Sequence, residues 1–84
     1  MNYILPDGRI IDTSRIESIS SVRDLGRDTK TIDRNRMGFT IHLSNREIVD
    51  IREYYQYSDW ALVKTRMNRL HADLRQKWQE EDNK

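Results

Sequence analysis

The longest regular pattern of apolar positions runs through the last third of the chain. Apolar side chains recur there at spacings of three and four residues, at Trp60, Val63, Met67, Leu70, Leu74 and Trp78. At about 100° per residue, such spacing lines one stripe of an α-helix. No Gly or Pro interrupts the run, and Ser58 or Asp59 precedes it as a suitable N-cap. The pattern therefore predicts an amphipathic helix over residues 58–81.

Alternation of period two marks the clearest strand. Every second residue from Met37 to Leu43 is apolar, and Gly, Thr and His stand between them, which is typical of a strand with one buried face. Asn45, in the polar connection that follows, suits a left-handed backbone. Residues 48–54 then predict the returning strand of a hairpin, with Val49 and Ile51 on the buried face.

The first third of the chain indicates shorter elements. Tyr3–Leu5 is a brief apolar run, Pro6–Gly8 has the residues of a hairpin turn, and two isoleucines return after it. Residues 12–14 favour one turn of 3₁₀ helix, with Ile16 directed inward. Residues 17–23 are rich in Ser, Ile and Val with a loose alternation, and they predict a further strand.

Together these elements predict the fold class α+β: an antiparallel meander sheet of roughly four to five strands, with one long C-terminal amphipathic helix packed on one face. We expect a single domain over residues 1–84, with the sheet within residues 2–54 and the helix over residues 58–81. The polar segment 24–36 is expected to be a mobile loop, because Leu25 and Ile32 are its only aliphatic residues.

The composition indicates an ordered domain with a thin core. Hydrophobic residues make up 36% of the chain and charged residues 35%, with a net charge of only +1. A small domain of this kind often gains stability from a partner. No Cys is present, the start lacks the regions of a signal peptide, and no apolar run approaches the ~20 residues of a membrane span. We therefore expect a cytoplasmic protein without membrane contact.

Little in the sequence indicates catalysis or metal binding. His42 and His71 are its only histidines, and neither has the sequence neighbours of a metal ligand at the usual spacing. The sequence also lacks the H-E-x-x-H, P-loop, nucleophile-elbow and dinucleotide-binding patterns. We expect no enzyme, no metal site and no cofactor.

The apolar stripe of the predicted helix is the main candidate interface. About 23 residues at 1.5 Å each give a helix of roughly 34 Å, whereas strands of about seven residues reach only about 23 Å. The sheet should then leave Leu74 and Trp78 uncovered, and a second copy of the chain would cover them. We expect a homodimer, or another protein partner, to contact Trp60, Met67, Leu70, Leu74, Trp78, Tyr55 and Tyr57.

A cluster of aromatic residues near the start of the helix leaves two interpretations open. Its members are Tyr54, Tyr55, Tyr57 and Trp60. They are either divided evenly between the core and its rim, or exposed together as an interaction patch. Tyr and Trp are favoured interface anchors because each combines a large apolar surface with a polar group.

Basic residues indicate an alternative partner. Five basic and three acidic residues give segment 23–36 a charge of +2, and five basic residues against one acidic give residues 60–78 a charge of +4. A nucleic acid would then contact Arg27, Lys30, Arg34, Arg36, Arg66 and Arg69. On a helical wheel, however, the helix cations flank the apolar stripe on both sides, as they do on a solvated helix that packs on a core.

Protein binding is thus the preferred function. We predict a small non-catalytic protein-binding module, of the regulator or inhibitor type, that self-associates through its C-terminal helix. The alternative is a nucleic-acid-binding accessory protein that uses the basic segment 23–36 and the helix flanks.

Overall fold

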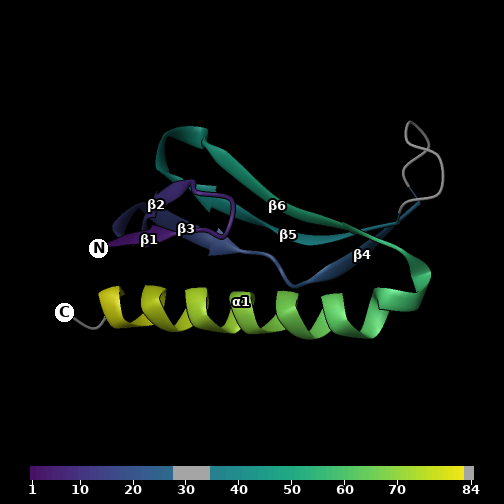
Figure 1. Ribbon diagram of the computed structural model, residues 1–84. Helices are drawn as coiled ribbons and strands as arrows, with labels where there is room; N and C mark the ends of the chain where they lie inside the picture. Colours follow the sequence, from purple (N-terminus) through teal and green to yellow (C-terminus); the bar gives the residue numbers. More distant parts are fainter. Residues whose placement is uncertain (28–34, 83–84) are drawn as a thin grey trace.

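The computed structural model describes residues 1–27 and 35–82 (Figure 1). Within these residues the chain forms the strands β1 (Asn2–Ile4), β2 (Ile10–Asp12), β3 (Ile16–Ile19), β4 (Arg23–Arg27), β5 (Asn35–Leu43) and β6 (Ile48–Tyr55). The helix α1 (Trp60–Asp82) follows them, and the 3₁₀ turns are η1 (Thr13–Arg15), η2 (Ser44–Arg46) and η3 (Tyr57–Asp59). The α+β class, with antiparallel strands followed by one C-terminal helix, is confirmed.

β5 is the central strand of a four-stranded antiparallel sheet. β6 pairs with β5 from Asn35↔Tyr55 to His42↔Ile48. β3 and β4 follow each other along the opposite side of β5, so that together they form one broken strand. The remaining strands, β1 and β2, pair with each other in a separate two-stranded sheet.

A serine bridges the break between β3 and β4. The Ser20 N–H donates to the Thr40 carbonyl oxygen over 2.9 Å, and the Thr40 N–H donates to Ser20 Oγ over 2.8 Å. The Ser20 hydroxyl thus replaces a backbone carbonyl at the point where the ladder is interrupted. The predicted strand over residues 17–23 is therefore wrong in its bounds.

The predicted loop over residues 24–36 is wrong at both ends. β4 includes residues 24–27, and β5 begins at Asn35. β4 lacks apolar alternation and is formed by backbone pairing with β5, with a bulge between Asp24 and Gly26. Gly26 adopts a φ of 75°, and its N–H donates to the Asp24 carboxylate over 2.9 Å. The predicted mobility concerns chiefly residues 28–34, which lie outside the described residues.

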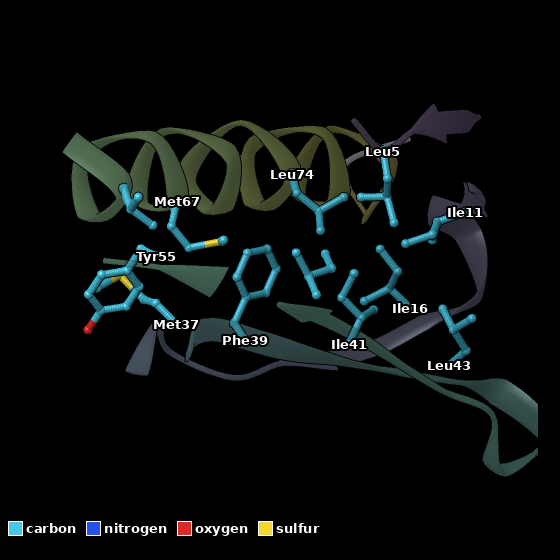
Figure 2. Packing of buried hydrophobic residues seen from close by; sticks show 12 residues of the cluster. Leu5, Ile11, Ile16, Met37, Phe39, Ile41, Leu43, Tyr55, Met67 and Leu74 are labelled. Carbon is cyan, nitrogen blue, oxygen red and sulfur yellow. The ribbon is translucent and has the colours of Figure 1, made fainter. Parts of the chain in front are cut away.

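One apolar layer lies between the four-stranded sheet and α1 (Figure 2). The sheet supplies the alternating residues of β5, namely Met37, Phe39, Ile41 and Leu43, each at most 5% exposed. The helix supplies Val63, Met67 and Leu74, whose exposures do not exceed 3%. Both sequence patterns that predicted this layer are confirmed. The helix begins at Trp60 rather than at residue 58, because Tyr57–Asp59 form η3.

The hairpin β1–β2 covers the end of α1, so the prediction that one chain leaves Leu74 and Trp78 uncovered is wrong. Leu74 is 0% exposed, and Trp78 is partly buried against the core. The length estimate treated all strands as one sheet, whereas the hairpin is a second sheet that lies directly above the last turns of the helix in Figure 1. Leu5 and Ile11, each 2% exposed, are hairpin residues that pack in the core.

Two polar contacts fasten the hairpin to the helix. The Tyr3 hydroxyl donates to Asp73 Oδ2 over 2.6 Å, and the Met1 amino group lies 3.3 Å from Glu81 Oε1. Burial, followed by the hydrogen bond to Asp73, raises the pKa of Tyr3 to about 12. The Tyr3–Asp73 bond therefore needs the protonated phenol, which is present across the neutral pH range.

Local turn chemistry follows the sequence closely. Gly8 adopts a φ of 94° in the first hairpin turn, and Asn45 adopts a φ of 64° in the connection between β5 and β6. Asp12 accepts a 3.0 Å hydrogen bond from the Ser14 N–H at the start of η1, and Ile16 is 7% exposed beyond it. Arg46 has a φ of 63°, which the sequence did not predict, because Arg does not share the tolerance of Gly and Asn for a left-handed backbone.

β5 and β6 approach so closely at Gly38 that a side chain has no room there. A Cβ atom placed on Gly38 would overlap the backbone carbonyl oxygen of Ile51. The obstacle is backbone rather than the end of a flexible side chain, so it cannot move without shifting β6. Gly38 is thus required by the spacing of the two strands.

Gly38→Ala is expected to destabilise the fold by about 1–3 kcal/mol, because the added methyl group forces β5 and β6 apart. Elsewhere in a strand, the same change stabilises by roughly 0.5–1 kcal/mol. Urea unfolding monitored by circular dichroism measures the difference. Ser18→Ala, at an exposed position of β3, is the control, and an equally stable or more stable Gly38→Ala protein would contradict the close approach.

Two leucines of α1 should respond differently to the same change. Leu74→Ala removes a side chain that is 0% exposed and is expected to cost about 2–5 kcal/mol through lost burial and a cavity. Leu62→Ala, at a position 64% exposed, should lie within about 0.5 kcal/mol of the wild type. Free energies of unfolding in urea measure both. Similar losses for the two variants would show that the face of α1 has been misassigned.

Candidate functional site

The aromatic residues at the junction of β6 and α1 separate into one buried and three exposed side chains. Tyr55 faces the helix and is 5% exposed, whereas Tyr54, its neighbour on the strand, faces outward. Beyond the strand, Tyr57 in η3 is 85% exposed and Trp60 at the start of α1 is 38% exposed. The even division between core and rim is therefore not what the chain adopts, because three of the four side chains are exposed.

Asp24 is the polar centre of this junction. Its carboxylate accepts hydrogen bonds from the Gly26 N–H at 2.9 Å and the Tyr55 hydroxyl at 2.7 Å. The Gly26 bond is the main reason that the pKa of Asp24 lies below its usual 3.8, with further lowering by Tyr55 and the Trp60 side chain. Burial, followed by the bond to Asp24, raises the pKa of Tyr55 to about 12. One carboxylate thus joins β4 and β6, beside the first residue of α1.

A groove opens beside this carboxylate, between the end of β4 and the start of the helix. We call it the junction groove. It has a volume of about 610 Å³ and is lined by Asp24, Gly26, Asn35, Tyr55, Tyr57, Ser58, Trp60 and Ala61. On the helix beside it, Lys64 Nζ lies 4.6 Å from the centroid of the Trp60 ring. Aromatic walls around a fixed carboxylate suit the binding of a side chain from another molecule.

The chemistry of the junction groove favours binding over proton transfer. A general base works best with a pKa near neutrality, whereas the hydrogen bonds to Asp24 move its pKa in the opposite direction. Within residues 1–27 and 35–82, no three His, Cys, Asp or Glu side chains gather as metal ligands. In that same part of the chain, no helix has the length and apolar character needed to cross a bilayer.

Most of the residues predicted as an interface lie inside the chain's own core. Met67, Leu74 and Tyr55 are at most 5% exposed, and Leu70 and Trp78 are partly buried against the same core. They are unsuited to a second chain in this fold, because the sheet and the hairpin already cover them. Three predicted interface residues line the junction groove, namely Tyr55, Tyr57 and Trp60, and of these Tyr57 and Trp60 are exposed.

Of the basic residues predicted to contact nucleic acid, those whose side chains the structure describes do not form one surface. Arg36 lies on the face of β5 opposite the buried residues, so the sheet separates it from α1. Arg66 Nη1 lies 3.1 Å from Glu53 Oε1, and Arg69 is exposed on the helix. Arg27 ends β4, while Lys30 and Arg34 lie outside the described residues.

Both histidines have positions that packing explains. His42 is exposed on the outer face of β5, as the alternation predicts. His71 Nε2 lies 2.8 Å from the Ser20 carbonyl oxygen, and its ring meets Phe39 edge-on with centroids 4.9 Å apart. The helical wheel placed His71 at the edge of the apolar stripe, where it in fact joins the helix to the break between β3 and β4.

Sequence reasoning missed Asp24 because it lay in a segment assigned to a loop. The available signal was local: an Asp two residues before a Gly is the pattern of a side chain that binds a nearby backbone N–H. The partners Tyr55 and Trp60 are distant in sequence, and only the pairing of β4 with β5 brings Asp24 to them.

Comparison with known proteins adds no family to this description. No protein-family model, curated protein or solved structure matches the chain.

Tyr55→Phe should test the role of the Asp24 carboxylate. Loss of the hydroxyl is expected to cost about 1 kcal/mol at neutral pH. Because the pKa of Asp24 is lower in the folded protein than in the unfolded chain, the stability from its charged form is present above 3.8 and is lost as the pH falls through the folded value. The difference in the free energy of unfolding between wild type and Tyr55→Phe should therefore become smaller as the pH falls.

Urea unfolding between neutral pH and ~3 measures this effect. Tyr57→Phe is the matched control, because its side chain is 85% exposed, and it should unfold like the wild type at every pH. A constant difference between wild type and Tyr55→Phe across this range would show that the charge on Asp24 does not contribute.

Proposed function

We propose that this chain is a small non-catalytic protein-binding module, of the regulator or inhibitor type, that receives part of its partner in the junction groove. The observation that carries the proposal is Tyr57, which is 85% exposed at the rim of a groove of about 610 Å³. A tyrosine in that position contributes little to the isolated fold. It gains substantial burial when a partner covers it.

The groove is also prepared for binding. The Tyr55 hydroxyl donates to Asp24, so this wall of the groove is ordered before a partner arrives. Binding then requires little further ordering of this wall, and this reduces its entropic cost. Ala61 adds a small apolar surface to the lining of the groove.

The most suitable partner is a protein segment that brings an apolar or cationic side chain to the groove. An apolar side chain would pack on Tyr57 and Trp60, and a cation would face the Asp24 carboxylate beside the aromatic rings. Self-association through the helix stripe is no longer supported by uncovered residues, because the same chain covers Leu74 and Trp78. We therefore propose that the partner binds at the start of α1.

Site-specific photo-crosslinking tests the proposal. A photoreactive phenylalanine at position 57 is expected to capture a defined protein in extracts of the native host, because this side chain lies at the groove. The same group at position 62, which is 64% exposed on α1 outside the groove, is the matched control. Capture should also fall when Ala61→Glu narrows the groove and adds a charge.

Equal capture from positions 57 and 62, or capture that Ala61→Glu leaves unchanged, would contradict binding at the junction groove. Circular dichroism of each variant shows whether the fold is retained. Because Tyr57 and Leu62 are both exposed, substitution at either position should leave the free energy of unfolding within about 0.5 kcal/mol of wild type.

A further inference from the structure

β6 forms an edge of the four-stranded sheet, with β5 as its strand neighbour among the described residues (Figure 1). Thr40 of β5 stands opposite Asp50, and both backbone groups of Thr40 bond to Ser20 on the far side of β5. Asp50 consequently turns its N–H and C=O away from β5. Its carbonyl oxygen indeed accepts a 2.8 Å hydrogen bond from Arg9 Nη2, from outside the sheet.

The same orientation recurs at every second residue of β6, because the backbone of a strand repeats with period two. Ile48, Arg52 and Tyr54 therefore direct their backbone N–H and C=O groups along the same outer edge as Asp50. Such an edge is a template for a further strand.

The side chains of these same residues form a self-complementary series. They are Ile48, which is 59% exposed, Asp50, Arg52 and Tyr54, which is 46% exposed. In order they are apolar, acidic, basic and apolar. An antiparallel copy reverses the order, so that apolar faces apolar and acid faces base. Cross-strand pairs of both kinds stabilise antiparallel sheets.

We propose that β6 is a homodimerisation edge, on which two copies of the chain pair their β6 strands antiparallel about a two-fold axis beside Ile51. Asp50 then lies opposite Arg52 of the second copy, and Ile48 lies opposite its Tyr54. The two four-stranded sheets join into one continuous sheet. This surface is separate from the junction groove, and neither depends on the other.

The backbone selects this register together with the charges. Residues that pair by hydrogen bonds across the edge must be those whose backbone groups point outward, which excludes every pairing register shifted by one residue. Moving the two-fold axis from Ile51 to Arg52 shifts the pairing register by two residues. That register satisfies the backbone but places Arg52 opposite its own copy. Like charges directly opposite each other are unfavourable. The axis beside Ile51 satisfies both conditions.

One existing contact is exchanged in the dimer. The Arg52 N–H of the second copy takes the place of Arg9 Nη2 as donor to the Asp50 carbonyl oxygen. Arg9 is 47% exposed and keeps its 2.7 Å contact from Nε to Asp7 Oδ2. The charged side chains are already oriented, because Arg52 lies 3.3 Å from Asp50 and Thr40 donates to Asp50 over 2.9 Å.

Charge reversal tests this register directly. Asp50→Arg alone places Arg against Arg at the edge, and Arg52→Asp alone places Asp against Asp. Each should raise the dimer dissociation constant roughly tenfold or more, measured by sedimentation equilibrium. An equal mixture of the two variants restores Arg against Asp in a heterodimer and should associate like the wild type. The double variant Asp50→Arg/Arg52→Asp should likewise regain self-association.

Recovery in the mixture distinguishes the edge from a general loss of folding, because neither chain is repaired individually. Ile48→Ser should also weaken association, whereas Ile4→Ser, at a hairpin position 68% exposed, is the matched control and should not. A wild type that remains monomeric at high micromolar concentration would overturn the proposal. A wild-type dimer whose single variants associate equally well, alone or mixed, would also overturn it.

Discussion

The contact between β5 and α1 is the interaction on which the rest of the structure depends. β5 pairs with β6 on one side and with β3 and β4 on the other, so every strand of the larger sheet is positioned by it. Its alternating apolar residues meet the apolar stripe of α1 in one layer, in which Ile41 and Leu74 are both 0% exposed. Burial of that layer is the main favourable term for so small a domain. Weakening it would loosen the sheet, the hairpin and the junction together.

The parts of the fold that the sequence predicted are those whose signals are local and periodic. The alternation in β5 and the three–four spacing in α1 each repeat over several turns or pairs, and each identifies its own buried face. β4 has no such pattern, because pairing with β5 determines it. The position of the hairpin β1–β2 was likewise not predictable, since its contacts with Asp73 and Glu81 join the two ends of the sequence.

The same distinction between local signals and long-range contacts applies to the candidate site. The aromatic cluster near residue 57 was evident in the sequence, but its division into one buried and three exposed rings follows from the pleat of β6 and the position of η3. Asp24 joined the site only because a bulged strand carries it to Tyr55. The uncovered helix end failed as a prediction for a related reason: it compared lengths of elements without knowing that two strands form a second sheet.

The distance in sequence between the hairpin and the helix end that covers it has a consequence for synthesis in the cell. The ribosome makes β1 and β2 first, yet Leu5 and Ile11 obtain their cover only after the residues around Leu74 have been made and have left the exit tunnel. Until then the nascent chain exposes a hairpin and the free apolar face of β5. The domain therefore completes its core in one late step, after both ends of the described chain have been made.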